Sequence, residues 1–167
     1  MNYLKNNKGF TLTELLIIIA IMVALLSLAG YAYNAYMVRY NIEKEIKEIY
    51  ADLMTARMRA LQQNQQYLIQ FGTSSYTTYI DNDEDGQLDN PGDTLVGDLS
   101  KSGLSYNLAW NFGSIITFDS KGLSNVNGSV WISLPNNKPN DSEYDCINIS
   151  RTRIKMGKRN GANCINR

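Results

Sequence analysis

The sequence has no histidine in its 167 residues, and its 16 basic and 16 acidic side chains leave a formal net charge of zero. Without histidine the chain has no Ser-His-Asp triad, no histidine general base and no histidine ligand for zinc. It also lacks the excess of positive charge that is typical of proteins that coat nucleic acids. We therefore expect a protein that is not an enzyme, in which any nucleic-acid site is local.

Cysteine is scarce as well, because the only two are Cys146 and Cys164. Their spacing matches no CxxC redox or zinc motif. In an exported domain the pair would be oxidised to a disulfide, which would stabilise the fold by about 3 kcal/mol in the loop-entropy model. The alternative is a pair of free buried thiols, which an oxidising compartment disfavours.

The N-terminal segment has an unusual order of polar and apolar residues. Residues 1–9 are polar, contain Lys5 and Lys8 and have no apolar core, so they are not a secretory signal peptide. Residues 15–38 follow without a single charged side chain, which is enough for a helix that spans a bilayer. The two lysines precede this run, so the positive-inside rule leaves residues 1–9 in the cytoplasm and places the C-terminus outside.

A carboxylate, Glu14, stands at the start of the apolar run. A carboxylate in hydrocarbon is costly unless it has a partner. One explanation is an acid at the start of a helix, stabilised by the helix dipole at the membrane surface. The other explanation is a buried carboxylate that is paired with a cation.

Residues 8–16, KGFTLTELL, resemble the prepilin processing motif of type IV pilins and type II secretion pseudopilins. The resemblance implies that prepilin peptidase cleaves between Gly9 and Phe10 and that the new N-terminal Phe10 is N-methylated. It also implies that Glu14 pairs with the N-terminal amine of a neighbouring subunit during assembly. Cleavage creates that amine, which is the cation that a buried carboxylate would need.

The same resemblance implies a location and a set of partners. The precursor would be a single-pass protein of the bacterial inner membrane with a periplasmic C-terminal domain. It would then enter a pilus or pseudopilus at the cell surface or in the periplasm. Its partners would be other pilins or pseudopilins, the prepilin peptidase and methyltransferase, and the inner membrane.

Beyond the apolar run, the spacing of apolar residues predicts a helix that packs on a domain. They recur at alternating steps of four and three, which forms one stripe on a helix; the stripe comprises Ile42, Ile46, Ile49, Leu53, Ala56 and Ala60. We expect one helix over residues 10–63. Its first part, residues 10–38, would form the membrane anchor and filament core, and residues 39–63 would pack on the globular domain.

After residue 63 the pattern changes to short runs typical of strands, separated by Gly, Asn, Asp and Pro turns. The expected strands are residues 67–71, 75–80, 94–99, 104–108, 114–118, 129–134, 145–149 and 153–156. Strands connected so closely favour antiparallel pairing. The predicted fold is α+β, with a long N-terminal helix and an antiparallel β-sheet domain over residues 64–167, the lollipop of pilins.

Three segments of this domain resemble the GspH/FimT branch of minor pilins and pseudopilins. They are residues 115–122 (IITFDSKG), 128–132 (GSVWI) and 146–151 (CINISR). The resemblance covers most of the domain but is looser than that of the processing motif.

One acidic segment resembles a calcium loop. Acids at every second position followed by glycine match the first nine positions of an EF-hand loop, with candidate ligands Asp81, Asp83, Asp85, Gln87 and Asp89. The closing glutamate is missing, because Gly92 stands in its place, and no flanking EF-hand helices are expected. The alternative is a solvated hairpin tip.

The C-terminal segment is basic and carries no acid after Asp145. A turn near residues 151–152 would place its arginines at a hairpin tip, where they could bind phosphates without base specificity. The candidate residues are Arg151, Arg153, Lys155, Lys158 and Arg159. The segment is similar in character to the C-terminal arginine motif with which FimT-type pilins bind DNA, but it lacks the glycine of that motif. The alternatives are a solvated face and a contact with acidic neighbours in a filament.

The sequence therefore predicts a structural subunit, a minor pilin or pseudopilin of a type IV pilus or type II secretion pseudopilus. It requires no cofactor, and calcium is the one ion that its loops suggest. The alternative function is a DNA-binding, FimT-like minor pilin for DNA uptake in natural transformation.

Overall fold

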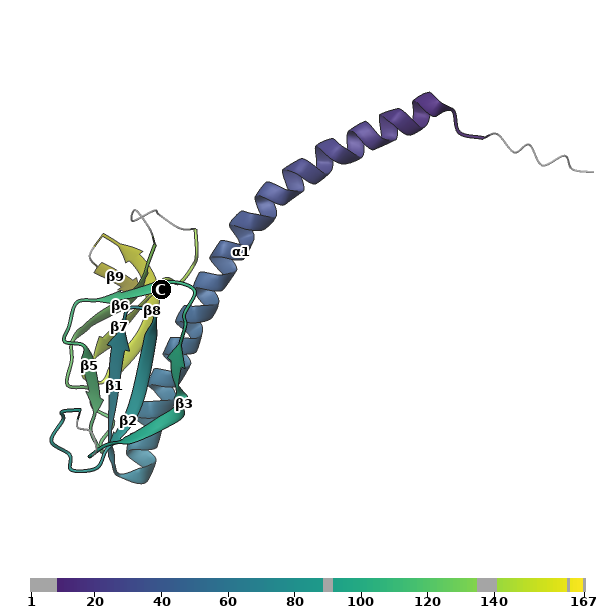
Figure 1. Ribbon diagram of the computed structural model, residues 1–167. Coiled ribbons are helices and arrows are strands. Elements are labelled where there is room, and N and C mark those ends of the chain that lie inside the picture. Colours follow the sequence, from purple (N-terminus) through teal and green to yellow (C-terminus); the bar gives the residue numbers. More distant parts are fainter. Residues whose placement is uncertain (1–8, 89–91, 135–140, 162, 167) are drawn as a thin grey trace, which may run out of the picture. The chain divides into compact units, whose positions relative to one another are not determined.

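The computed structural model describes residues 9–88, 92–134, 141–161 and 163–166 (Figure 1). The chain divides into two compact units, Met1–Val38 and Arg39–Arg167, which we describe separately. Helix α1, Leu12–Gln63, contributes residues to both units.

In the first unit, α1 presents large apolar side chains to the surroundings, with Leu15, Ile17 and Leu25 each more than half exposed. A search of the described part of the chain for helices long and apolar enough to cross a membrane found none.

In the second unit, α1 ends with a backbone turn. Asn64 adopts the left-handed conformation with a φ of 54°, and the N–H of Gln65 donates to the carbonyl of Ala60 at 3.3 Å. This is the hydrogen bond of a Schellman motif, which satisfies a carbonyl that the helix end would otherwise leave without a donor. The chain thereby reverses directly into the first strand.

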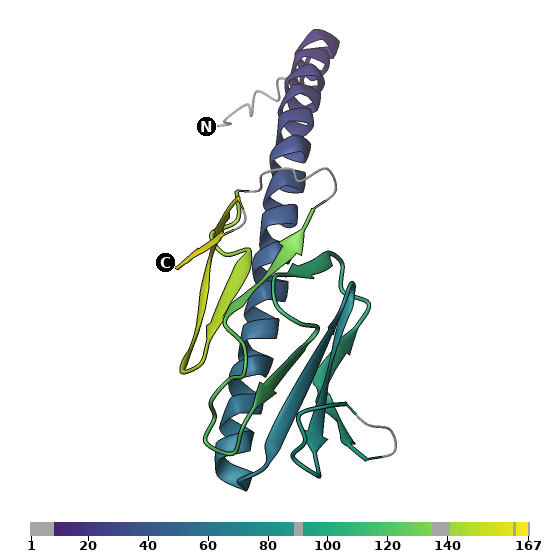
Figure 2. The same cartoon turned by 90° about the vertical axis from the view of Figure 1, so that its left-hand side faces the viewer.

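Two antiparallel sheets follow. The first sheet has four strands in the order β3-β2-β1-β5 and the second has five in the order β4-β6-β7-β8-β9. The first comprises β1 (Gln66–Gly72), β2 (Ser75–Asp81), β3 (Thr94–Ser102) and β5 (Ile115–Phe118). The second comprises β4 (Asn107–Trp110), β6 (Gly128–Ser133), β7 (Cys146–Ser150), β8 (Arg153–Asn160) and β9 (Asn163–Asn166) (Figure 2).

One hydrophobic core joins both sheets to α1. All six residues of the predicted apolar stripe are at most 2% exposed. They share a cluster with Ile69 and Phe118 of the first sheet and with Val130 and Ile147 of the second. Full burial of one such side chain stabilises a fold by about 1.5–3 kcal/mol. The stripe is therefore what fastens residues 39–63 to the sheets.

The α+β fold with its antiparallel strands is confirmed, although the strands expected at 94–99 and 153–156 extend to Ser102 and Asn160. The strand expected at 104–108 is wrong in position, because β4 begins only at Asn107 and Leu104 instead packs into the core from a loop. The N–H of Leu104 donates to the carbonyl of Ser74, in the turn between β1 and β2, rather than to a neighbouring strand. Strand β9 was not predicted, since its sequence NCIN has neither strong alternation nor a high apolar content.

Candidate functional sites

The predicted processing site precedes α1. Phe10 is 80% exposed and Gly9 is exposed as well. Thr11 is the N-cap: its Oγ1 accepts from the N–H of Glu14 at 3.2 Å, and its own N–H donates to Glu14 Oε2 at 3.0 Å. This reciprocal pair is a capping box, which satisfies two backbone donors at the helix start. Glu14 therefore holds the first turn of α1 together.

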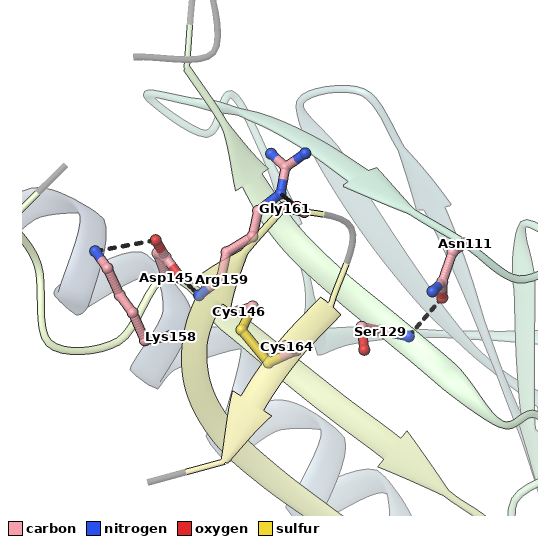
Figure 3. Close-up of a disulfide and its surroundings, with 8 residues drawn as sticks. All are labelled: Asn111, Ser129, Asp145, Cys146, Lys158, Arg159, Gly161 and Cys164. Carbon is pink, nitrogen blue, oxygen red and sulfur yellow. Dashed lines mark hydrogen bonds and ion pairs between the residues drawn. A yellow bond between two sulfur atoms is a disulfide. The ribbon is translucent and has the colours of Figure 1, made fainter. Parts of the chain in front are cut away.

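The cysteines form the disulfide Cys146–Cys164, with Cα atoms 5.9 Å apart (Figure 3). It crosses β8 and links β7 to the edge strand β9. Gly157 of β8 lies between these two strands and leaves room for the backbone of β9, because a Cβ at this position would lie 2.3 Å from the carbonyl oxygen of Ile165. The bridge and the glycine together keep β9 in place.

The predicted turn at residues 151–152 is present and joins β7 to β8. Arg151, Arg153 and Lys155 are all exposed there. Three of the five basic residues are thus exposed at or near the turn of this hairpin, and the other two lie farther along β8 and are partly buried.

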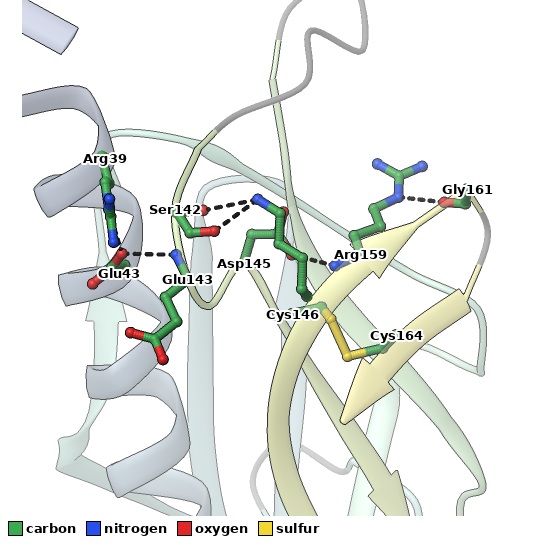
Figure 4. Close-up of polar contacts among 10 residues, drawn as sticks. Arg39, Glu43, Ser142, Glu143, Asp145, Cys146, Arg159, Gly161 and Cys164 are labelled. Carbon is green, nitrogen blue, oxygen red and sulfur yellow. Dashed lines mark hydrogen bonds and ion pairs between the residues drawn. A yellow bond between two sulfur atoms is a disulfide. The ribbon is translucent and has the colours of Figure 1, made fainter. Parts of the chain in front are cut away.

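The other two basic residues have structural partners. Lys158 Nζ lies 3.2 Å from Asp145 Oδ2 and donates to the carbonyl of Ser142 at 2.8 Å. The guanidinium of Arg159 lies 4.7 Å from the centre of the Trp131 ring. Its Nε donates to the carbonyl of Gly161, and its backbone N–H donates to Asp145 Oδ1 at 2.6 Å (Figures 3 and 4). Asp145 is buried, so these contacts compensate a charge that would be costly alone.

The acidic segment is the loop between β2 and β3. A carboxylate oxygen from each of Asp81, Asp83 and Asp85 lies within 4.8 Å of the others. Asp81 is buried and the other two are exposed. Gln87 donates its N–H to Asp85 Oδ1 at 2.7 Å, whereas Asp89 lies outside the described residues. Three of the five predicted ligands therefore come together.

Several polar contacts between α1 and the strands were not predicted. Asp52 accepts a hydrogen bond from the Tyr76 hydroxyl, Glu48 pairs with Lys101, and buried Glu45 accepts from the N–H of Ser105 at 2.7 Å. Arg59 binds Asp98 through two hydrogen bonds of 3.1 and 2.5 Å. These residues lie 24 to 60 positions apart in the sequence, so helical periodicity carries no signal of them.

Contacts of α1 with the rest of the domain shift the pKa values of Tyr76 and Glu43. Burial, and then the hydrogen bond to Asp52, raises the pKa of Tyr76 well above its usual value. The N–H of Glu143 donates to Glu43 Oε1 at 2.8 Å and lowers the pKa of Glu43, with Arg39 at 3.0 Å adding to the effect (Figure 4). At neutral pH Tyr76 therefore stays protonated and can donate to Asp52, and Glu43 stays ionised and can accept from the N–H of Glu143.

A polar groove of about 550 Å³ was also missed by sequence reasoning. Its lining includes Asp85 of the acidic loop, Asp119 and Ser124 of the loop after β5, and Arg151 of the basic hairpin. The N–H of Ser124 donates to the carbonyl of Arg151 at 2.9 Å, which holds these two loops together. Because two acids share the wall with Arg151, the groove itself does not favour phosphate.

The N-terminal helix followed by an antiparallel β domain matches the fold of solved minor pilins and pseudopilins. The model of the prokaryotic N-terminal methylation motif matches residues 4–30. The model of the type II transport protein GspH matches residues 45–152, and the chain therefore belongs to the GspH family.

Solved structures agree with this fold. The type IV minor pilin FimU of Pseudomonas aeruginosa is 17% identical with a TM-score of 0.55, over 78% of this chain and 96% of FimU. The minor pseudopilin EpsH from the type II secretion system of Vibrio cholerae is 11% identical with a TM-score of 0.54, over 75% of this chain and 99% of EpsH. A comparison with curated proteins found no significant match.

Proposed function

We propose that this chain is a minor structural subunit of a type IV pilus or a type II secretion pseudopilus. The observation that carries the proposal is the combination, in one chain, of a methylation motif at residues 4–30 and a GspH domain at residues 45–152. Prepilin peptidase would cleave between Gly9 and Phe10, and Phe10 would be methylated. The chain has no histidine, and we propose no catalytic activity and no cofactor requirement for assembly.

Residues 10–38 would act twice in this mechanism. Their uncharged stretch from residue 15 supports a role as the inner-membrane anchor of the precursor, with the β domain in the periplasm. The exposed apolar side chains of the first unit then support a role in the filament core, where neighbouring subunits would cover them.

Glu14 would set the register between subunits. The capping box already holds its carboxylate at the first turn of α1, beside the terminus that cleavage creates. In an apolar filament core, a carboxylate and the Phe10 amine of a neighbour would each lack water and would therefore require one another. Only one axial offset between two subunits satisfies both charges.

Substitution Glu14→Ala tests this role. We expect the variant to be cleaved and to remain in the membrane fraction, with at least tenfold less of it in sheared filaments than wild type, because the neighbour's amine loses its partner. The matched control is Glu84→Ala, which removes an exposed acid far along the sequence from the helix start. Mass spectrometry of the filament fraction checks for an N-terminal methylated Phe10 and identifies the pilins that co-purify.

Equal incorporation of Glu14→Ala and wild type would contradict the assembly role of Glu14. A filament-bound chain that still carries residues 1–9 would contradict processing at Gly9.

A second candidate function is DNA binding at the β7–β8 hairpin. The exposure of Arg151, Arg153 and Lys155 on one hairpin favours it. Lys158 and Arg159 would contribute less, because they are engaged with Asp145 and Trp131. We propose binding to the phosphate backbone without base specificity, because arginine and lysine side chains at an exposed tip can contact phosphates, and such contacts carry no sequence information.

A salt series with the full chain in detergent tests this second function. Three phosphate contacts predict an affinity for duplex DNA that falls about 40-fold between 50 and 200 mM salt. The double variant Arg151→Ala/Arg153→Ala should remove about two of the three contacts and flatten the salt dependence. The control Lys44→Ala/Lys47→Ala removes the same charge from the helix. Binding that survives in the hairpin variant, or no binding at 50 mM salt, would leave filament assembly as the function.

A further inference from the structure

The loop between β2 and β3 is closed at its base. Asn82 Nδ2 donates to the carbonyl of Gly92 at 2.7 Å and to Thr94 Oγ1 at 3.0 Å. Inside this closure, Gly86 turns the chain with a φ of 75°, a conformation that suits glycine. The turn allows side chains at alternate positions of one short segment to point toward a common centre.

Backbone and amide donors orient the three carboxylates. Asp81 Oδ2 accepts from the N–H of Gly86 at 2.9 Å and from Gln66 Nε2 at 2.7 Å. Asp83 Oδ1 accepts from the N–H of Asp85 at 3.4 Å, and Asp85 accepts from Gln87. Each carboxylate is thus held by the loop or by the adjacent strand, and the lone pairs that these donors leave over are available to a cation.

The decisive atom is Asp81 Oδ1. Asp81 is 1% exposed, and its Oδ1 is buried without a hydrogen-bond partner among the described residues. A buried carboxylate oxygen without a donor or a cation is costly. None of the ion pairs found in the described part of the chain involves Asp81, Asp83 or Asp85. No basic side chain in the described part of the chain therefore forms an ion pair with this cluster.

We propose that Asp81, Asp83 and Asp85 bind a calcium ion. Calcium prefers carboxylate, carbonyl and water oxygens in a flexible shell of six to eight ligands. One rigid, buried acid and two exposed acids fit this shell better than the strict octahedron of magnesium. Water would complete the coordination, so we expect the affinity of extracellular calcium modules, with a Kd of about 10⁻⁴–10⁻³ M.

Calcium titration of the full chain in detergent micelles, after treatment with EGTA, tests the proposal. Isothermal titration calorimetry should give a Kd in that range, and 10 mM calcium should raise the Tm of the β domain by about 4 °C or more. The same concentration of magnesium should raise it by less than half as much. Near-ultraviolet circular dichroism follows the unfolding of the domain through its tyrosines and tryptophans.

Two variants separate the site from general charge effects. Asp83→Asn/Asp85→Asn changes only exposed ligands, so it should fold and lose both the binding heat and the Tm shift. Glu84→Gln removes a charge from the same loop but no member of the cluster, and it should respond to calcium as wild type does. Absence of binding heat and of a Tm shift in wild type up to 10 mM calcium would overturn the proposal. An undiminished response of the double aspartate variant would overturn it equally.

Discussion

At the scale of single residues, polar contacts of Tyr76 and Glu45 add to the apolar stripe that holds residues 39–63 of α1 to the β domain. Tyr76 on β2 is 2% exposed and donates its hydroxyl hydrogen bond to Asp52 on α1. Glu45, which lies about two turns before Asp52 on α1, accepts from the N–H of Ser105 in the loop between β3 and β4. These contacts satisfy the Tyr76 hydroxyl and one oxygen of the buried Glu45 carboxylate, whereas Glu45 Oε2 is buried without a hydrogen-bond partner among the described residues.

Stability should therefore fall at alkaline pH. The pKa of Tyr76 is raised in the folded state, so its contribution is complete below the unfolded tyrosine pKa of about 10 and is lost as the pH rises above it. We expect Tyr76→Phe to cost about 1–3 kcal/mol at pH 8 and to reduce the loss of stability between pH 8 and pH 11 by about 1 kcal/mol. Urea unfolding at both pH values measures this.

Tyr79→Phe, on the same strand, controls for the removal of a hydroxyl group. A pH dependence of Tyr76→Phe identical to that of wild type would show that Tyr76 keeps an ordinary pKa in the folded protein.

At the scale of elements, β9 depends on a covalent bond. It is a four-residue edge strand, and its Ile165 is 51% exposed, so apolar burial contributes little to its position. The disulfide to Cys146 anchors it across β8, whereas β7 and β8 contribute Ile147, Ile149 and Ile154 to the core.

Removal of the disulfide should accordingly release β9 and spare the rest of the sheet. We expect Cys146→Ala/Cys164→Ala to lose about 3 kcal/mol in urea unfolding, because the unfolded chain gains the freedom of an open loop. Hydrogen exchange should become fast at residues 163–166 and stay slow in β6 and β7. Reductant should destabilise wild type to the same extent and leave the variant unchanged. Retained protection of β9 in the variant would contradict this account.

At the scale of the whole molecule, the two units pose different physical problems. The first unit exposes its apolar side chains along α1, whereas the second encloses one core between residues 39–63 and two sheets. An exposed apolar helix needs an apolar environment from outside the chain. The Glu14→Ala experiment belongs to this scale, because in the proposed filament neighbouring subunits would supply both that environment and the amine.

Membership of the GspH family rests on residues 45–152, and the proposed route into a filament rests on the N-terminus. The DNA-binding and calcium experiments address surfaces of the β domain alone. Their outcomes therefore leave the proposed assembly mechanism untouched, and a failure of assembly would not decide either of them.

Local patterns in the sequence determined the helix, most strands and the family. The stripe from Ile42 to Ala60 repeats with the period of a helix, and the structure buries all of it. The α+β class follows from the change of period after residue 63. The turn at residues 151–152 was predicted because the apolar residues before it, Ile147 and Ile149, occupy odd positions, whereas those after it, Ile154 and Met156, occupy even positions. Each of these signals depends on neighbours within a few positions.

Only the tertiary structure decided which polar groups meet. The pairing of Asp145 with Lys158, the groove between the loops of Asp119 and Arg151, and the bond between Tyr76 and Asp52 all join distant parts of the chain. The burial of Asp81 likewise depends on its pairing with Gln66 at the start of β1. Periodicity describes which side of one element faces the core, but it does not specify which elements become neighbours. Those neighbours determine whether a charged side chain is solvated, paired with another side chain or able to bind an ion.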